Sequence, residues 1–300
     1  MMTIKNCTVA IVGLGLLGAS LGMALRGKCA KVVGWARRAE TRRKAVAVGA
    51  VDETCDNPAD AVGSADLTIL CLPIPVIIEF LLTNSGHFKK GSAVTDIGSV
   101  KAQIVAAGEA ALTPENVHFI GSHPMAGTEK NGLDAAFKTL YSHAEVFVTP
   151  TAASDVSAVN LVTAMWEQVD THVNLLEPTP HDELVAHTSH ISHLLALGLT
   201  LSVLAEKDEQ LRRLRFSGCA TGFRDTSRIV SSSPAMWRQI VEANRGPVLQ
   251  AIAEFESKFS LIKQLITEER FDEFEQLFGE GKFLRDSWIE YKNKEHGCNW

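Results

Sequence analysis

The stretch Gly13-Leu14-Gly15-Leu16-Leu17-Gly18 decides how the chain begins to fold, because it directly follows the apolar run Thr8 to Val12. The run predicts a buried strand, and Leu17 to Leu25 predicts the helix that comes after it. In a G-x-G-x-x-G turn the first glycine permits the tight turn and the second lets a pyrophosphate approach the backbone. The third allows close packing of helix on strand, and the free N–H groups of the helix start attract phosphate. The alternative is a glycine-rich turn with a structural role only. The predicted dinucleotide site comprises Gly13, Gly15, Leu16, Leu17 and Gly18.

Short apolar runs alternate with helical patterns over residues 1–177. This alternation is typical of a parallel sheet with helices on both faces. We therefore predict an α/β Rossmann domain, doubly wound with a mostly parallel sheet, that binds a dinucleotide. The further strands are expected at Lys31 to Trp35, Leu67 to Leu72, Ser92 to Asp96, Val117 to Ile120, Glu145 to Val148 and Val173 to Leu176.

The pattern changes after Pro178 and Pro180, where helical periodicity replaces the strand-like runs. Residues 178–300 are predicted to form an all-helical C-terminal domain for substrate binding and dimerisation. The predicted helix Leu184 to Leu204 is so apolar that it requires burial on all sides. A twofold homodimer that shares its helical domains would bury it.

Composition narrows the class of protein further. The chain has 300 residues, a size that suggests two domains, and a formal net charge of -6, which argues against nucleic-acid binding. Its six cysteines form no C-x-x-C pair and predict free thiols in a reducing compartment. The N-terminal run is too short for a signal peptide, and no uninterrupted apolar run reaches the roughly 18 residues of a membrane span. We expect a cytoplasmic protein without membrane contact.

The residues that follow the second predicted strand bear on the choice of dinucleotide. NAD-binding domains usually carry Asp or Glu there, which accepts hydrogen bonds from the adenosine ribose. Here Ala36 occupies that position, and Arg37 and Arg38 follow. Because arginine pairs well with a phosphate, we favour NADP as cofactor, with NAD as the alternative. The two arginines can also be an ordinary solvated helix start.

Four more segments, taken in order with the glycine turn, carry a specific resemblance. From about Val9 to Asn244 the chain resembles the prephenate/arogenate dehydrogenase family of tyrosine biosynthesis. The resemblance implies oxidation of prephenate to 4-hydroxyphenylpyruvate, or of arogenate to tyrosine, with hydride transfer to the nicotinamide and loss of carbon dioxide. Of the two small-molecule substrates, we favour prephenate. The segments are Asp96-Ile97-Gly98-Ser99-Val100-Lys101, Ser122-His123-Pro124-Met125-Ala126-Gly127-Thr128-Glu129, Ser189-His190-Ile191-Ser192-His193-Leu194 and Gly222-Phe223-Arg224-Asp225-Thr226-Ser227-Arg228-Ile229.

By this resemblance His123 is the catalytic base and Ser99 positions the substrate hydroxyl and the nicotinamide. An imidazole with a pKa near 6.5 suits proton acceptance at neutral pH. His123 is predicted to follow a strand at the carboxyl edge of the sheet, where ligands bind in such folds. The alternative is a loop histidine without a role. Pro73, after the run Leu67 to Leu72, is assigned to the cofactor site with Ser99.

The substrate carboxylates are assigned to Arg228, whose guanidinium is a forked donor. Asp225 stands three residues earlier and is expected to orient it, although the two can equally form a surface salt bridge of little energetic value. His193 is expected to face the substrate. Many relatives carry proline where this chain has Ser192, so we expect a straighter helix here. The resemblance adds His190 and Trp237 to the substrate site, although Trp237 can equally be a helix-packing residue, and it places His181 at the substrate or at the domain junction.

Two other readings of the chain remain open. A β-hydroxyacid or 6-phosphogluconate type of dehydrogenase shares the layout but uses a catalytic lysine, and no lysine lies between His181 and Glu206. A catalytically inactive NADP-sensing regulator would not need Ser99, His123 and Arg228 together. We expect no metal site, because His187, His190 and His193 spread around a helix without an acidic ligand.

Overall fold

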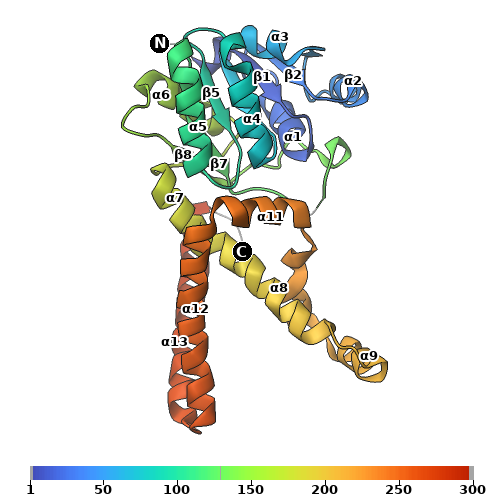
Figure 1. Ribbon diagram of the computed structural model, residues 1–300, viewed down its shortest axis with the longest axis vertical. Helices are drawn as coiled ribbons and strands as arrows, with labels where there is room; N and C mark the ends of the chain where they lie inside the picture. The colour runs from blue at the N-terminus through green and yellow to red at the C-terminus, as the bar shows by residue number, and fades with distance from the viewer. Residues whose placement is uncertain (1–2, 129, 297–300) are drawn as a thin grey trace. The chain divides into compact units, whose positions relative to one another are not determined.

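The computed structural model describes residues 3–128 and 130–296 (Figure 1). They divide into two compact units, one that ends at Arg245 and one that begins at Gly246. The larger unit contains both sheets and the candidate site.

The core of the larger unit is a six-stranded, fully parallel sheet with the order β3-β2-β1-β4-β5-β6. The chain builds outward from β1 to β3 and then returns to the other side of β1 to add β4. The carboxyl ends of β1 and β4 therefore lie at the switch point where ligands bind in open α/β folds. The strands are β1 (Thr8–Val12), β2 (Lys31–Trp35), β3 (Glu53–Thr54), β4 (Leu67–Leu70), β5 (Ala93–Asp96) and β6 (His118–Phe119).

Helices cover both faces of this sheet, which confirms the doubly wound fold. α4 and α5 pack against each other in front of the sheet in Figure 1, and α6 packs against β5 and β8. The helices are α1 (Leu16–Leu25), α2 (Ala39–Ala47), α3 (Pro58–Gly63), α4 (Ile74–Asn84), α5 (Ala102–Leu112) and α6 (Val156–Glu167). Short 3₁₀ turns lie at Ile4–Asn6, Ser85–His87, Thr113–Glu115, Leu133–Ala135 and Arg228–Ser231.

A second, three-stranded sheet contains β7 (Gly121–Pro124), β8 (Glu145–Thr149) and β9 (His172–Leu175). β7 pairs antiparallel with β8, and β8 pairs parallel with β9. His123 therefore lies within a strand, whereas we expected it to follow one. Hydrogen bonds join Ser122 of β7 to the end of β5. Asp96 Oδ1 accepts a bond from the Ser122 backbone N–H at 3.2 Å, and Ser122 Oγ donates to the Asp96 carbonyl at 2.6 Å.

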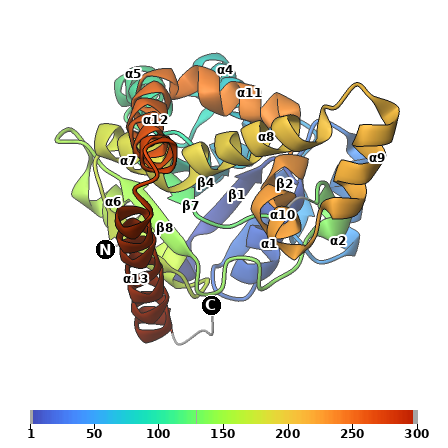
Figure 2. The same cartoon turned by 90° about the horizontal axis from the view of Figure 1, so that it is seen from below.

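The rest of the larger unit is helical (Figure 2). Its helices are α7 (Pro178–Val185), α8 (Ile191–Leu204), α9 (Glu209–Gly218), α10 (Thr221–Ser227) and α11 (Pro234–Ala243). A π turn, Ala186–His190, joins α7 to α8. The run expected to be a straight helix thus contains an irregular turn. α8 contacts α9 and α10, and α11 contacts α4.

The run Pro178–Leu204 also changes one expectation. Among the described helical runs it is the one that is long and apolar enough to cross a bilayer. The core helices of globular proteins can reach the same length and apolar composition. We expected no segment of that kind. The run carries three buried polar side chains, His181, Asp182 and His190.

The smaller unit contains α12 (Arg245–Thr267) from its second residue onward and α13 (Phe271–His296), with Glu269 in the left-handed conformation between them (φ 57°). Both helices expose large apolar side chains, among them Phe259 and Phe278. In the chain as a whole the described cysteines are free thiols, and Cys298 lies outside the described residues.

Candidate active site

A cavity of about 840 Å³ in the larger unit brings together most of the predicted site residues. One wall is the start of α1, and the end of β4 and the residues after β5 lie beside it. β7 supplies His123, and the helical region supplies His193 and Arg228. The predicted residues that line it are Gly15, Leu16, Leu17, Gly18, Ser99, His123, His190, His193, Arg228 and Trp237.

The three glycines of the turn have the steric roles expected of a pyrophosphate site. Gly13 has φ +102°, and a Cβ there would lie 2.2 Å from the Cys71 carbonyl oxygen. A Cβ on Gly18 would lie 1.9 Å from the Gly13 oxygen, so helix and strand pack too closely for a side chain. A Cβ on Gly15 would have no atom within 4 Å, and no side chain caps the start of α1. The first N–H groups of α1 are thus accessible to phosphate oxygens.

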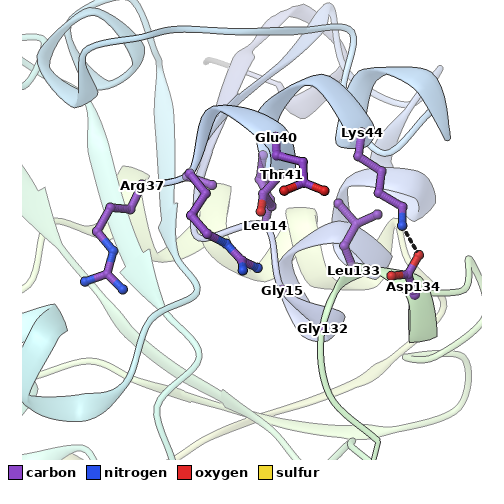
Figure 3. Close-up of a pocket in the computed structure, with 11 residues that line it drawn as sticks. Leu14, Gly15, Arg37, Glu40, Thr41, Lys44, Gly132, Leu133 and Asp134 are labelled. Atoms are coloured by element: carbon purple, nitrogen blue, oxygen red, sulfur yellow. Dashed lines mark ion pairs between the residues drawn. The ribbon is translucent and has the colours of Figure 1, made fainter.

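A second cavity, of about 510 Å³, lies at the carboxyl end of β2 and extends to Gly15 (Figure 3). Ala36, Arg37 and Arg38 line it, as predicted, and α2 adds Thr41 and Lys44. This is the place where the adenosine ribose of a dinucleotide lies in such folds. The residues present fit a dinucleotide.

Pro73, which was assigned to the cofactor site, is the exposed N-cap residue of α4. Its neighbours Leu72 and Ile74 line the large cavity, so Pro73 lies beside it.

A chain of hydrogen bonds extends from His123 into the core. His123 is 8% exposed, and its Nδ1 lies 2.9 Å from His181 Nε2. His181 Nδ1 lies 2.8 Å from Asp182 Oδ1. His181 was expected at the substrate or at the domain junction. It is fully buried behind His123, where a residue of 178–300 contacts one of 1–177, which is the second of the two expected places.

Asp182 also fixes the start of α5. Its Oδ1 accepts the Lys101 backbone N–H at 2.7 Å, and its Oδ2 accepts that of Ala102 at 2.9 Å. Carboxylates are favourable at helix N-termini. A single side chain of α7 thus connects His181 to the Rossmann domain.

Lys101, which sequence reasoning did not assign, lies fully buried beside this chain of bonds. Its Nζ donates to Asp96 Oδ2 and, at 2.9 Å, to the Ser122 carbonyl. Both ions stand in the quoted segment Asp96 to Lys101, so the signal was present in the sequence. The clue was the pair of opposite charges at the two ends of a segment that carries no other charged residue.

Burial keeps the site imidazoles neutral near pH 7. It lowers the pKa of His123 well below 6.5, and the neighbouring His181 and Lys101 lower it further. Burial also lowers the pKa of His181 and that of His193. The pKa of His190 falls to about 4, mainly because of burial.

The helical wall of the cavity is built around Trp237. Its ring centroid lies 4.0 Å from that of His193. His190, 1% exposed, shares a 3.1 Å contact between its Nδ1 and Asn244 Nδ2, and Asn244 also donates to the Asp182 carbonyl at 2.8 Å. Asn244 is a second buried residue that sequence reasoning missed. Its position after α11 gave no motif to signal it.

The expected contact between Asp225 and Arg228 is absent from the described part of the chain. Asp225 pairs with Arg224 at 2.9 Å, and both are exposed. The reason is that the adjacent guanidinium of Arg224 competes for the same carboxylate. Arg228 lines the cavity without Asp225, and Glu129 of the His123 segment lies outside the described residues.

These features define a class of protein. The sheet is doubly wound and carries a pyrophosphate turn, and the adjoining cavity contains an imidazole and a hydroxyl. This is the arrangement of a nicotinamide-dependent dehydrogenase. Two family models match the chain, "Prephenate dehydrogenase, nucleotide-binding domain" over residues 21–175 and "Prephenate dehydrogenase, dimerization domain" over residues 177–280. The chain belongs to the prephenate dehydrogenase family and is an oxidoreductase with a nicotinamide cofactor.

Named relatives agree with this family. Cyclohexadienyl dehydrogenase of Zymomonas mobilis is 32% identical over 92% of this chain and 94% of its own length. Prephenate dehydrogenase of Bacillus subtilis is 30% identical over 93% of this chain and 75% of its own length. The predicted resemblance is thereby confirmed.

Solved structures give the same result. Prephenate dehydrogenase from A. aeolicus, in complex with hydroxyphenyl propionate and NAD+, has a TM-score of 0.86 at 32% identity and covers 96% of this chain and 98% of its own. Synechocystis arogenate dehydrogenase has a TM-score of 0.83 at 29% identity and covers 94% and 100%. 3-Hydroxyisobutyrate dehydrogenase from Mycobacterium tuberculosis, at 16% identity and a TM-score of 0.58, shares the fold alone.

Proposed function

We propose that this chain oxidises prephenate to 4-hydroxyphenylpyruvate and carbon dioxide in the cytoplasm, as a step of tyrosine biosynthesis. The observation that carries the proposal is the shared cavity of the glycine turn, Ser99, His123 and Arg228. The bound dinucleotide supplies the hydride acceptor. We also propose the division of the chain into a cofactor domain, 1–177, and a substrate and dimerisation domain, 178–300.

The hydrogen-bond chain determines which nitrogen of His123 is the base. The Asp182 carboxylate only accepts, so His181 carries its proton on Nδ1, and its Nε2 accepts. His123 must then donate from Nδ1, which leaves the lone pair of Nε2 for the hydroxyl proton of the substrate. When that proton arrives, the positive charge of the imidazolium is stabilised through His181 by Asp182. His123 thus accepts the proton, and His181 and Asp182 stabilise the charge that results.

Arg228 and Ser99 complete the binding of the substrate. The guanidinium of Arg228 offers parallel N–H donors to a carboxylate, and Ser99 offers a hydroxyl at the end of β5. The neutral His190 and His193 form an uncharged wall with Trp237. A wall of this kind limits the access of water to the substrate ring, whereas a substrate carboxylate pairs with Arg228.

Arogenate is the second candidate, and an arogenate dehydrogenase is among the similar structures. Arogenate carries an ammonium group where prephenate carries a ketone. Among the described residues that line the cavity there is no carboxylate, whereas Lys130 and Arg228 are cationic. A cationic lining favours the keto acid over the ammonium form.

NADP is the proposed cofactor. Support comes from the guanidinium groups of Arg37 and Arg38 in the second cavity and from Ala36 at the usual position of the acid. A 2′-phosphate pairs with these cations, and a carboxylate at position 36 would repel it.

A homodimer through the helical domain is also part of the proposal. The matched "dimerization domain" supports it, as does the exposure of Leu197 (43%) and Leu201 (57%) on α8. Such side chains on an apolar helix are buried by a partner helix in a dimer. Light scattering at micromolar concentration should give twice the mass of one chain. A monomeric mass would refute this part.

The deciding experiment mixes the purified protein with prephenate or arogenate and with NADP or NAD, and follows the absorbance of the reduced cofactor. We expect the highest kcat/KM with prephenate and NADP. A preference for arogenate, or for NAD, would replace the corresponding part of the proposal. Dinucleotide binding without turnover of either substrate would indicate the regulator instead.

A further inference from the structure

The second cavity contains an ion pair that no step of the reaction uses. Lys44 Nζ, on α2, pairs with Asp134 Oδ1 on the 3₁₀ turn Leu133–Ala135. Figure 3 shows the pair at one end of the cavity and Arg37 at the other. Both side chains are accessible, with 44% and 80% exposed, so a ligand can reach either of them.

The charges that line this cavity have mixed sign. Arg37, Arg38 and Lys44 are cationic, and Glu40 and Asp134 are anionic. A 2′-phosphate adds roughly -1.5 to -2 charges to this space, whereas a 2′-hydroxyl adds none. Asp134 therefore opposes the phosphate in two ways, by direct repulsion and by occupying the ammonium group of Lys44. Neither effect acts on a hydroxyl.

Asp134 does not belong to the strand end whose residues usually distinguish NAD from NADP. The acid of NAD-binding domains stands at the end of the second strand, and Ala36 fills that position here. Asp134 reaches the same cavity from a turn 98 residues later in the sequence, between β7 and β8. Gly132, just before it, lines this cavity and the large cavity with His123.

We propose that Asp134 is a specificity-determining residue that limits the affinity for a 2′-phosphate, and that Lys44 is the cation it competes for. The proposal rests on the proposed use of this cavity for the adenosine ribose. In the presence of NADP, Lys44 leaves Asp134 and pairs with the phosphate. In the presence of NAD, the ion pair stays intact.

Direct binding of NADP, NAD and the fragment 2′,5′-ADP to the apoprotein, measured by calorimetry, tests this. Asp134→Asn should tighten the binding of NADP and 2′,5′-ADP by about 3–10-fold and change that of NAD by less than about twofold. Lys44→Met should weaken the binding of NADP and of 2′,5′-ADP by about 10-fold and leave the binding of NAD unchanged. Glu53→Gln and Lys31→Met break a comparably exposed ion pair between neighbouring strands, outside the cavity, and serve as matched controls.

The outcomes separate this inference from the proposed cofactor preference. If the wild-type protein binds NAD more tightly but Asp134→Asn still tightens 2′,5′-ADP, the preference is wrong and the role of Asp134 stands. If Asp134→Asn leaves NADP and 2′,5′-ADP unchanged, or weakens NAD as much as it affects NADP, the inference is overturned. Equal effects of Asp134→Asn and Glu53→Gln overturn it as well, because they would reflect net charge alone.

Discussion

At the scale of single residues, the site depends on proton positions that follow from one carboxylate. Asp182 accepts from His181, and His181 in turn accepts from His123, so the free lone pair of His123 is on Nε2. The low pKa of His123 keeps that lone pair available at neutral pH. The negative carboxylates of a bound substrate would raise this pKa again and make His123 a stronger base.

Removing His123, the proposed base, should slow turnover and leave substrate binding largely unchanged. We expect His123→Asn to lower kcat by about 10²–10⁴-fold with little change in KM for prephenate, because the proton then has no acceptor. Steady-state kinetics measure this. An unchanged kcat would exclude His123 as the base.

Arg228 should contribute to binding more than to the chemical step. We expect Arg228→Ala to raise KM for prephenate by at least about 10-fold and Arg228→Lys to restore only part of the affinity, because lysine lacks the planar fork. Arg224→Ala is the matched control, since Arg224 is an exposed arginine of the same segment that does not line the cavity. Equal effects at both positions would remove the assignment.

At the scale of elements, the start of α1 and the π turn before α8 shape the cavity. The glycine turn holds the N-terminus of α1 against β4 with no room for side chains at Gly13 and Gly18. The π turn Ala186–His190 precedes α8 and carries the buried His190, which contacts Asn244. π turns are frequent at functional sites because they redirect side chains within one helix.

Two alanine substitutions in the α1 turn should separate folding from cofactor binding. Gly15→Ala should leave the melting temperature nearly unchanged and weaken dinucleotide binding by more than about 10-fold, because its Cβ fills the open space of the pyrophosphate. Gly18→Ala should lower the stability by about 1–3 kcal/mol, because its Cβ meets the Gly13 oxygen. Thermal unfolding and calorimetry measure the two effects. Normal cofactor binding by Gly15→Ala would contradict the assignment.

At the scale of the whole molecule, the buried histidines make stability depend on pH. Burial lowers the folded-state pKa values of His123, His181 and His193, and that of His190 to about 4. In the unfolded chain these groups titrate near 6.5. Between those pH values the unfolded chain binds protons that the folded chain does not, so folding becomes less favourable as the pH falls.

We therefore expect stability to be constant above about pH 6.5 and to decrease towards pH 4, by up to about 1.4 kcal/mol per pH unit for each such histidine. Urea unfolding at a series of pH values measures the slope. His190→Gln should reduce it, and a substitution of the exposed His87 should not. A flat profile between pH 6.5 and 4 would contradict the buried neutral state.

How much the sequence predicted differs between these scales. The fold was predicted from the glycine turn and from the alternation of strands and helices. Most of the cavity lining was predicted from the motifs around Ser99, His123 and Arg228. The second sheet was not predicted, because the pairing of β7 with β8 and of β8 with β9 joins residues far apart in the sequence. The partner of Asp225 was wrong, since proximity in sequence does not say which neighbour a side chain contacts.

The sequence by itself determined the pyrophosphate turn, the parallel sheet and the family, because each of these depends on local patterns of residue type and spacing. The tertiary structure decided which residues act together. Asp182 binds the start of α5, His181 lies against His123, and Asp134 meets Lys44 at one end of the second cavity. Each of these contacts joins segments far apart in the sequence, whose distance in space is set by packing of the whole unit, and local patterns carry no record of it.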